Sequence, residues 1–247
     1  MSIKFLHKRN ENYDDNSVRE VILNNNTPFH VKEAYKTLRT NVMFSLPERG
    51  CKVIAITSPL PSEGKSTTIF NLAITFSQTG NRVLLIDGDM RRSNTRRIAP
   101  CDTDIGLSDV LAHFVNLKDA IKQSDYKNLS IIYSGNIPPN PAELLSGDSM
   151  REMLDVLKKL YDYIFIDMPP INVVTDAAVV SGLTNGIIVV AKHNVSHRDE
   201  LAEAVRRLRF VNAKILGVVL NHKEYQTKSV YSRYGKYNKY KDYYAYD

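Results

Sequence analysis

The sequence predicts an α/β fold, a mostly parallel central sheet flanked by helices on both faces. Three observations lead to this prediction. The chain has 247 residues, of which 43% are apolar and 24% charged, as in one large globular domain. Short apolar runs alternate along it with segments of helical period. Several runs, such as 187–191 and 215–220, are apolar throughout, which is typical of strands buried on both faces.

The predicted elements follow one another in a regular order. A first helix is predicted over 31–45, because Ala34, Leu38 and Val42 recur every four residues. Strands are then expected near 52–57, 82–86, 129–133, 162–167, 186–191 and 214–220, and helices near 65–79, 106–114, 141–145, 149–160, 175–182 and 197–211. This alternation favours parallel pairing, since parallel strands need a crossover connection between them.

The two ends of the chain differ in composition from its middle. Residues 1–30 are polar and include three consecutive asparagines and Pro28, so we expect a flexible N-terminal arm. Apolar periodicity stops at about residue 223, and residues 223–247 are expected to form a flexible, tyrosine-rich tail. The predicted folded domain therefore spans 31–222.

Charge, cysteines and hydropathy narrow the classes of function. The formal net charge of +6 and the pI of about 9.1 suit ATP, an anionic membrane surface or nucleic acid as a partner, and do not choose among them. Cys51 and Cys101 form no CxxC or metal-spaced cluster, as is typical of reduced cytosolic thiols. No apolar run approaches the ~18 residues of a membrane helix, and the N-terminus lacks the apolar stretch of a signal peptide. We therefore expect a cytoplasmic location.

A phosphate-binding loop is predicted at residues 61–67 (PSEGKST), directly after an apolar run. Gly64 permits close approach of the backbone to phosphate, Lys65 can reach the β and γ phosphates, and the Ser66 hydroxyl can bind Mg²⁺. The pattern GxxxxGK[ST] has a glycine where this chain has Pro59, so we expect a stiffer loop. The predicted ATP-binding residues of the loop are Ser62, Glu63, Gly64, Lys65, Ser66 and Thr67.

Three aspartates stand at the ends of two other buried strands. Asp87 and Asp89 follow the apolar run 83–86, and Asp167 follows 163–166. The carboxyl ends of parallel strands form the usual ligand edge of an open α/β sheet. Two carboxylates beside a triphosphate would repel it unless one binds Mg²⁺ and the other accepts a proton, so the sequence predicts a magnesium-dependent ATP site.

These motifs resemble the Walker A, A′ and B motifs of the bacterial tyrosine kinases of capsule and exopolysaccharide export. The resemblance covers about residue 30 to the end of the chain. It rests on residues 65–67, 84–91 (LLIDGDMR), 106–111 (GLSDVL), 135, 140–145 (NPAELL), 166–170 (IDMPP), 175–177 and the tyrosine-rich end. It implies a P-loop NTPase fold, related to that of the partition and division-site ATPases, and ATP-dependent phosphorylation of tyrosine.

The resemblance also implies roles for the site residues. Lys65 holds the phosphates, while Ser66 and Asp167 hold Mg²⁺ with help from Asp89 or Asp87. Asp87 is the predicted base that orients or deprotonates the attacking tyrosine, because a phenol with a pKa near 10 is a poor nucleophile at neutral pH. Asp89 remains the alternative for this role.

Two further features are interpreted through the same resemblance. Asn221, at the end of the last strand, is predicted to contact the adenine, and a capping role is the alternative. The ExxRxxR pattern of ring-shaped assembly reads Glu33, Lys36 and Arg39 here. Lysine keeps the charge but loses the bidentate fork of arginine, so we expect a weaker interface. An ordinary charged helix face is the other interpretation.

The phosphoacceptors are predicted in the tail. Eight of the fourteen tyrosines lie in the last 23 residues: Tyr225, Tyr231, Tyr234, Tyr237, Tyr240, Tyr243, Tyr244 and Tyr246. Residues 223–247 carry six Lys or Arg and three Asp or Glu, an excess that two phosphates of about −1.5 to −2 each would cancel. We expect phosphorylation in trans and an electrostatic switch on assembly. A basic aromatic segment for RNA or membrane is the rival interpretation.

Other functions stay open at this point. A partition-type ATPase switch would carry an extra lysine near the start of the loop, where this chain has Leu60. A non-catalytic, nucleotide-gated scaffold is a further alternative. The resemblance implies a homo-oligomeric ring, a cognate tyrosine phosphatase and no nucleic acid. It also implies a transmembrane activator, a polysaccharide copolymerase whose cytoplasmic tail recruits the chain to the inner face of the plasma membrane.

Overall fold

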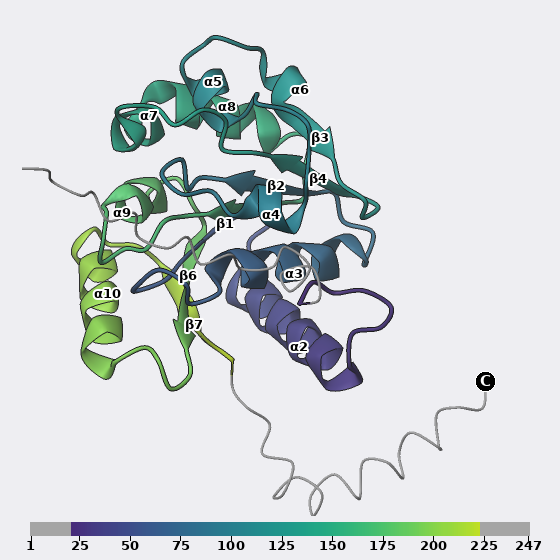
Figure 1. Ribbon diagram of the computed structural model, residues 1–247, viewed down its shortest axis with the longest axis vertical. Coiled ribbons are helices and arrows are strands. Elements are labelled where there is room, and N and C mark those ends of the chain that lie inside the picture. Colours follow the sequence, from purple (N-terminus) through teal and green to yellow (C-terminus); the bar gives the residue numbers. More distant parts are fainter. Residues whose placement is uncertain (1–20, 223–247) are drawn as a thin grey trace, which may run out of the picture.

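The computed structural model describes residues 21–222 and confirms the predicted α/β class (Figure 1). Its strands are β1 (Lys52–Thr57), β2 (Val83–Asp87), β3 (Ile121–Gln123), β4 (Leu129–Ile132), β5 (Tyr163–Asp167), β6 (Gly186–Lys192) and β7 (Ile215–Asn221). Its helices are α2 (Phe29–Ser45), α3 (Lys65–Ser77), α4 (Thr95–Ile98), α5 (Leu107–Leu111), α6 (Leu117–Ala120), α7 (Pro141–Ser146), α8 (Asp148–Leu157), α9 (Asp176–Ser181) and α10 (Arg198–Phe210).

Within the described residues, the strands form one seven-stranded sheet in the order β3-β4-β2-β5-β1-β6-β7. Neighbouring strands are parallel, except for the short edge strand β3, which runs antiparallel to β4. Because β5 lies between β1 and β2, the carboxyl ends of these three strands are neighbours. Asp167 of β5 stands opposite Ile56 of β1 on one side and Asp87 of β2 on the other. The phosphate loop and the predicted aspartates therefore share one edge of the sheet.

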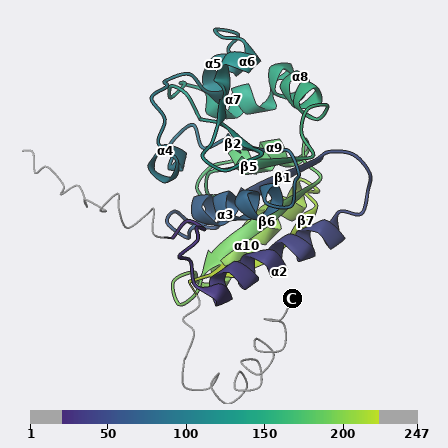
Figure 2. The same cartoon turned by 90° about the vertical axis from the view of Figure 1, so that its right-hand side faces the viewer.

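Two apolar layers hold the helices against the sheet, because alternate strand residues face opposite sides. On one face Ile54 and Phe165 pack with Phe76 of α3, and α2 covers α3 from outside. On the other face Ile166 packs in a cluster with Leu154 of α8 and with residues of α5, α7, α9 and α10. Figure 2 shows α5, α7 and α8 on the opposite side of the sheet from α2 and α3. This sandwich makes β1, β2 and β5 a rigid support for the loops that follow them.

Some local features differ from the sequence predictions. The elements α4, α6 and β3 were not predicted, since four residues or fewer are too short to show a period. The helix expected over 106–114 ends at Leu111, and His113 after it adopts a left-handed φ of 61°. Asp109 caps the start of that helix, because its Oδ2 accepts the Gly106 N–H at 2.9 Å.

The described end of the expected N-terminal arm contributes to the core. Ile22 and Leu23 are buried, and the Leu23 N–H donates to Asn71 Oδ1 at 2.8 Å. The helix predicted from residue 31 begins at Phe29, directly after Pro28. None of the helices in residues 21–222 combines the length and the hydropathy of a membrane-spanning segment.

Candidate active site

The phosphate loop begins where β1 ends and closes at the first turn of α3. Gly64 adopts a φ of +87°, a left-handed conformation that favours glycine. Pro59 replaces the usual first glycine, and side chains shape the turn instead. Ser58 Oγ donates to the Leu60 carbonyl at 2.7 Å, and the Leu60 N–H donates to Glu63 Oε2 at 2.9 Å. The other predicted loop residues are Ser62, exposed with a φ of 64°, and Thr67, half-buried in the first turn of α3.

A buried carboxylate ties this loop to the ends of β6 and β7. The Glu63 carboxylate accepts a hydrogen bond from Ser196 Oγ. Ser196 Oγ in turn accepts a hydrogen bond from the Lys192 N–H at 2.7 Å. The Glu63 carbonyl accepts Asn221 Nδ2 at 3.0 Å. Glu63 is only 2% exposed, and its carboxylate holds the loop together, while its contact with ATP stays a prediction.

Asn221 lies directly over Gly64. A Cβ atom at position 64 would stand 2.0 Å from Asn221 Nδ2, closer than any real contact. Asn221 Oδ1 also accepts the His222 N–H at 2.9 Å. The side chain thus caps the end of β7 and closes on the phosphate loop, while its contact with adenine stays a prediction.

We expect Gly64→Ala to abolish tight nucleotide binding and to lower stability. Alanine at position 64 would have to adopt a left-handed φ, which costs about 1 kcal/mol. Its methyl group would also clash with the side chain of Asn221 and displace it. Gly80→Ala is the matched control, because Gly80 has the same φ of +87° and nothing within 4 Å of an added Cβ. Nucleotide titration and thermal unfolding of both variants provide the measurement. Equal loss of binding in the two variants would contradict a specific role of the Gly64 contact.

Lys65 stands among three buried carboxylates, and we call Lys65, Asp87, Asp89 and Asp167 the Lys65 cluster. Lys65 Nζ donates to Asp89 Oδ2 at 3.1 Å and to Asp167 Oδ1 at 3.3 Å. Burial lowers the pKa of Lys65, but the charges of Asp167, Asp89 and Asp87 outweigh this effect and raise the pKa overall. The ammonium group therefore stays charged, and the cluster holds three carboxyl groups against one cation.

Asp87 is a buried carboxyl group of this cluster whose pKa is raised. Burial, and then the charge of Asp167, raises the pKa of Asp87 to about 7. Its carboxylate accepts Ser93 Oγ at 2.5 Å and the Asp89 N–H at 3.2 Å. A buried carboxylate whose pKa lies near neutrality is well matched to accept a proton.

Asp167 keeps one oxygen without a partner among the described residues. Its Oδ2 is buried and makes no hydrogen bond. Burial raises the pKa of Asp167, and Lys65 opposes this effect. Ser66 Oγ lies beside the same groups, 3.4 Å from Lys65 Nζ. A free carboxylate oxygen beside a hydroxyl fits Mg²⁺, which binds through one or two protein oxygens and takes its other ligands from water and phosphate.

In the described part of the chain, no three His, Cys, Asp or Glu side chains are grouped as metal ligands. The Lys65 cluster has its carboxylates in place, but Lys65 occupies two of them. An ion at this site would therefore depend on bound phosphate, which offers Lys65 another partner.

A second ion pair, which the sequence did not reveal, joins the loop after β2 to α9. Arg91 Nε and Nη2 donate to Asp176 Oδ2 and Oδ1 at 2.8 and 3.0 Å, and Asp176 is completely buried. The Gly88 N–H also donates to the Asp167 carbonyl at 2.8 Å. The segment that carries Asp89 is thus tied at two points to the segment that follows β5.

We expect Arg91→Ala to destabilise the domain by about 1–3 kcal/mol, because it leaves a buried carboxylate unpaired while Arg91 itself is partly exposed. Arg91→Lys should lose less stability, since lysine keeps the positive charge, although it cannot donate two parallel hydrogen bonds to the carboxylate. Replacing Asp176 by asparagine in the Arg91→Ala background should recover part of the loss. Urea unfolding measures all three, and an unchanged midpoint in Arg91→Ala would contradict the role of the pair.

The predicted assembly residues lie on α2. Lys36 Nζ and Glu33 Oε1 form an ion pair at 2.8 Å, and both side chains are exposed. Arg39 Nη1 instead donates to the Thr75 carbonyl of α3 at 2.7 Å, which anchors α2 to the core. The eight predicted phosphoacceptor tyrosines lie outside the described residues, so they stay predictions.

The chain is similar to known proteins over most of its length. A family model described as an AAA domain matches residues 51–216. The tyrosine-protein kinase YwqD of Bacillus subtilis (strain 168) is 38% identical over 199 residues, which cover 81% of this chain and 84% of that protein. The crystal structure of the chimerical protein CapA2B2 matches with a TM-score of 0.79 at 34% identity, covering 85% of this chain and 91% of the other.

A more distant likeness concerns the bound ligand. The septum site-determining protein MinD of Pyrococcus horikoshii OT3, solved in complex with Mg-ADP, matches with a TM-score of 0.59 at 25% identity. The match covers 74% of this chain and 76% of that one. In that protein the same fold holds a nucleotide and magnesium.

Proposed function

Because the chain belongs to the family of bacterial tyrosine-protein kinases, we propose that it uses ATP to phosphorylate the tyrosines of its own C-terminal segment. The Lys65 cluster is the observation that supports this best. It places a charged ammonium group, a free carboxylate oxygen and a carboxylate of raised pKa beside one phosphate loop. These are the groups that phosphoryl transfer to a hydroxyl needs.

The loop and the first turn of α3 bind the phosphates of ATP through their backbone N–H groups, where the helix dipole favours an anion. Lys65 exchanges its two carboxylate partners for oxygens of the β and γ phosphates. Mg²⁺, when it is held by Ser66 and Asp167 with Asp89, supplies the positive charge that offsets the charge of the phosphates. Asn221 keeps the loop closed on the side of β7.

Asp87 accepts the proton of the attacking tyrosine. The phenolic O–H bond breaks as a bond forms between that oxygen and the γ phosphorus, and the bond from the γ phosphorus to the β–γ bridging oxygen breaks to release ADP. Lys65 stabilises the charge that develops on the transferred group. Asp89 holds the metal rather than the proton, because its carboxylate contacts Lys65 Nζ directly, as that of Asp167 does.

The acceptor tyrosines lie in a segment that starts immediately after β7. A chain of about 25 residues has a root-mean-square reach of roughly 25–30 Å, enough to enter a neighbouring site if subunits assemble through the helix that carries Glu33, Lys36 and Arg39. Transfer within an assembly then runs in trans. Accumulating phosphates reverse the charge of the segment, which loosens the assembly.

The proposed cellular role follows the family. The kinase works in the cytoplasm, where the cytoplasmic tail of a transmembrane polysaccharide copolymerase recruits and activates it. Autophosphorylation, reversed by a tyrosine phosphatase, then controls the synthesis and export of capsule or exopolysaccharide. The similarity to the putative tyrosine-protein kinase CapB of Staphylococcus aureus, 34% identical over 201 residues, supports the kinase activity on which this role depends.

A mixing experiment tests the proposal. A Lys65→Met chain with an intact tail is incubated with ATP, Mg²⁺ and a catalytically intact chain whose eight tail tyrosines are replaced by phenylalanine. We expect phosphotyrosine on the Lys65→Met chain. If that chain stays unmodified while the wild type modifies itself, transfer runs in cis and the proposal of trans transfer is wrong. ATP hydrolysis without any phosphotyrosine would favour an ATPase switch instead.

A further inference from the structure

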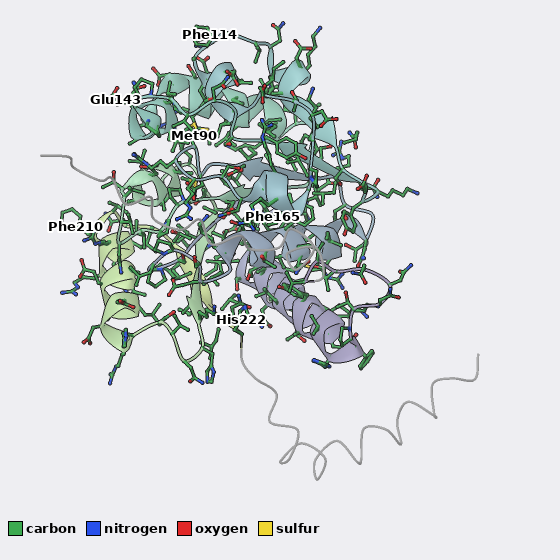
Figure 3. The ribbon with its side chains drawn as sticks, in the orientation of Figure 1. Met90, Phe114, Glu143, Phe165, Phe210 and His222 are labelled. Carbon is green, nitrogen blue, oxygen red and sulfur yellow. The ribbon has the colours of Figure 1, made fainter. Side chains whose placement is uncertain are left out.

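An apolar groove lies between α9 and α10, outside the Lys65 cluster. It has a volume of about 490 Å³, and Ile171, Val179, Phe210 and Val211 are among its lining residues. Phe210 is 88% exposed and projects from the end of α10 (Figure 3). An exposed phenylalanine beside an open apolar groove marks a surface that binds a partner.

Two arginines converge at the rim of this groove. Arg206 Nη2 and Arg207 Nε both approach the carboxylate of Glu203, at 2.5 and 2.8 Å. All three side chains line the groove, and both guanidinium groups remain accessible to solvent. Glu203 shows where an anion is held by this pair. Arginine clusters of this kind recognise phosphate, which offers more acceptor oxygens and more charge than one carboxylate.

We propose that the α9–α10 groove binds phosphotyrosine of the C-terminal segment, with the aromatic ring against Phe210 and the phosphate on Arg206 and Arg207. This inference rests on the proposed autophosphorylation. The groove matches both halves of the modified side chain, an apolar ring and a dianion. An unmodified tyrosine matches only the first half, so phosphorylation decides the binding.

The position of the segment fits this occupant. Residues 223–247 begin immediately after β7, and α10 packs on β7. With roughly 25–30 Å of reach, the distal tyrosines can return to the groove of their own subunit. Seven of these eight tyrosines lie at residue 231 or beyond, far enough along the segment to turn back. Docking there keeps a product tyrosine out of the active site and leaves the site open to the next acceptor.

Peptide titration tests the docking without any catalysis. Two labelled peptides of residues 236–247, one unmodified and one with phosphotyrosine at position 243, are added to the unphosphorylated full-length chain in the absence of ATP. We expect the phosphopeptide to bind at least tenfold more tightly. The double variant Arg206→Ala/Arg207→Ala should remove that difference, and Glu203→Gln should tighten phosphopeptide binding. Arg209→Ala is the matched control, since Arg209 lies on the same helix and does not line the groove.

Several results would overturn the assignment. Equal affinity for the two peptides, or full affinity in the double variant, removes the role of the arginines. If ADP with Mg²⁺ displaces the phosphopeptide, the peptide binds in the nucleotide site and not in the groove. If anionic vesicles bind through the same arginines while the double variant binds the phosphopeptide as well as the wild type does, the groove is a membrane-binding surface instead. The Lys65→Met chain should bind the phosphopeptide with the affinity of the wild type. The peptide titration therefore tests the docking even if the proposed kinase activity is wrong.

Discussion

The Lys65→Met chain is expected to form tyrosine phosphate at least about 10²–10³-fold more slowly than the wild type. Lys65 is the cation that the structure places between the phosphate loop and the carboxylates of Asp89 and Asp167. Methionine has similar reach but no charge, so stabilisation of the transferring phosphoryl group is lost. Phosphotyrosine formed per minute at saturating ATP, with the activator segment present, is the measurement.

The same substitution should also change the empty protein. Without Lys65, three buried carboxyl groups face one another with no ammonium group among them. The charge of Lys65 opposes the rise in the pKa values of Asp87 and Asp167, so these two pKa values should rise further. The matched control is Lys52→Met, because Lys52 is also buried, at 5% exposure, but its ion pair within the described residues is with the exposed Glu48, at 4.0 Å. That variant should keep its activity. Wild-type phosphotyrosine in Lys65→Met, or equal losses in both variants, would refute the assignment of the site.

Much of the fold could be predicted because its signals are local. Each buried parallel strand is a run of apolar residues, and β1, β2 and β5 were expected within one residue of their observed bounds. The site follows from the same pattern, since strand ends at one edge of a parallel sheet bring Lys65, Asp87 and Asp167 together. Pro59 was a visible departure in the sequence. The bonds of Ser58 and Glu63 to Leu60 explain why the loop tolerates it.

The remaining features depend on side chains that meet across the fold. Arg91 and Asp176 are 85 positions apart, and Glu63 and Ser196 are 133 apart. Neither pair produces a periodic pattern in the sequence, because each partner is a single polar residue and the two partners lie far apart along the chain. The ATP contact predicted for the phosphate-loop residue Glu63 stays a prediction, whereas the support that its carboxylate gives the loop was not expected. The groove at Phe210 was also missed, since an exposed phenylalanine at a helix end resembles any other apolar residue in sequence.

Asp87→Asn is expected to abolish phosphoryl transfer and to stabilise the nucleotide-free, metal-free protein. The pKa of Asp87 is raised from 3.8 to about 7, chiefly by burial. Below pH 3.8 the carboxyl group is protonated in both states. As pH rises from there to about 7, the unfolded chain loses the proton first, so the free energy of unfolding falls, and above 7 the full penalty is present. Asparagine cannot ionise, so urea unfolding in EDTA should show a gain at pH 8 and little change near pH 4.

Asp167→Asn should separate metal binding from proton transfer. The Asp167 oxygen that has no partner among the described residues is the one we assign to Mg²⁺, so its loss should weaken ATP binding when Mg²⁺ is present and change it little in EDTA. Asp87→Asn should instead keep Mg²⁺-dependent ATP binding within a few-fold of wild type, because Asp87 acts only when the tyrosine attacks. Nucleotide titrations of both variants, with and without Mg²⁺, decide the matter. Equal loss of Mg²⁺-dependent affinity in the two variants would mean that the carboxylates share the metal, and the base would then have to be another group.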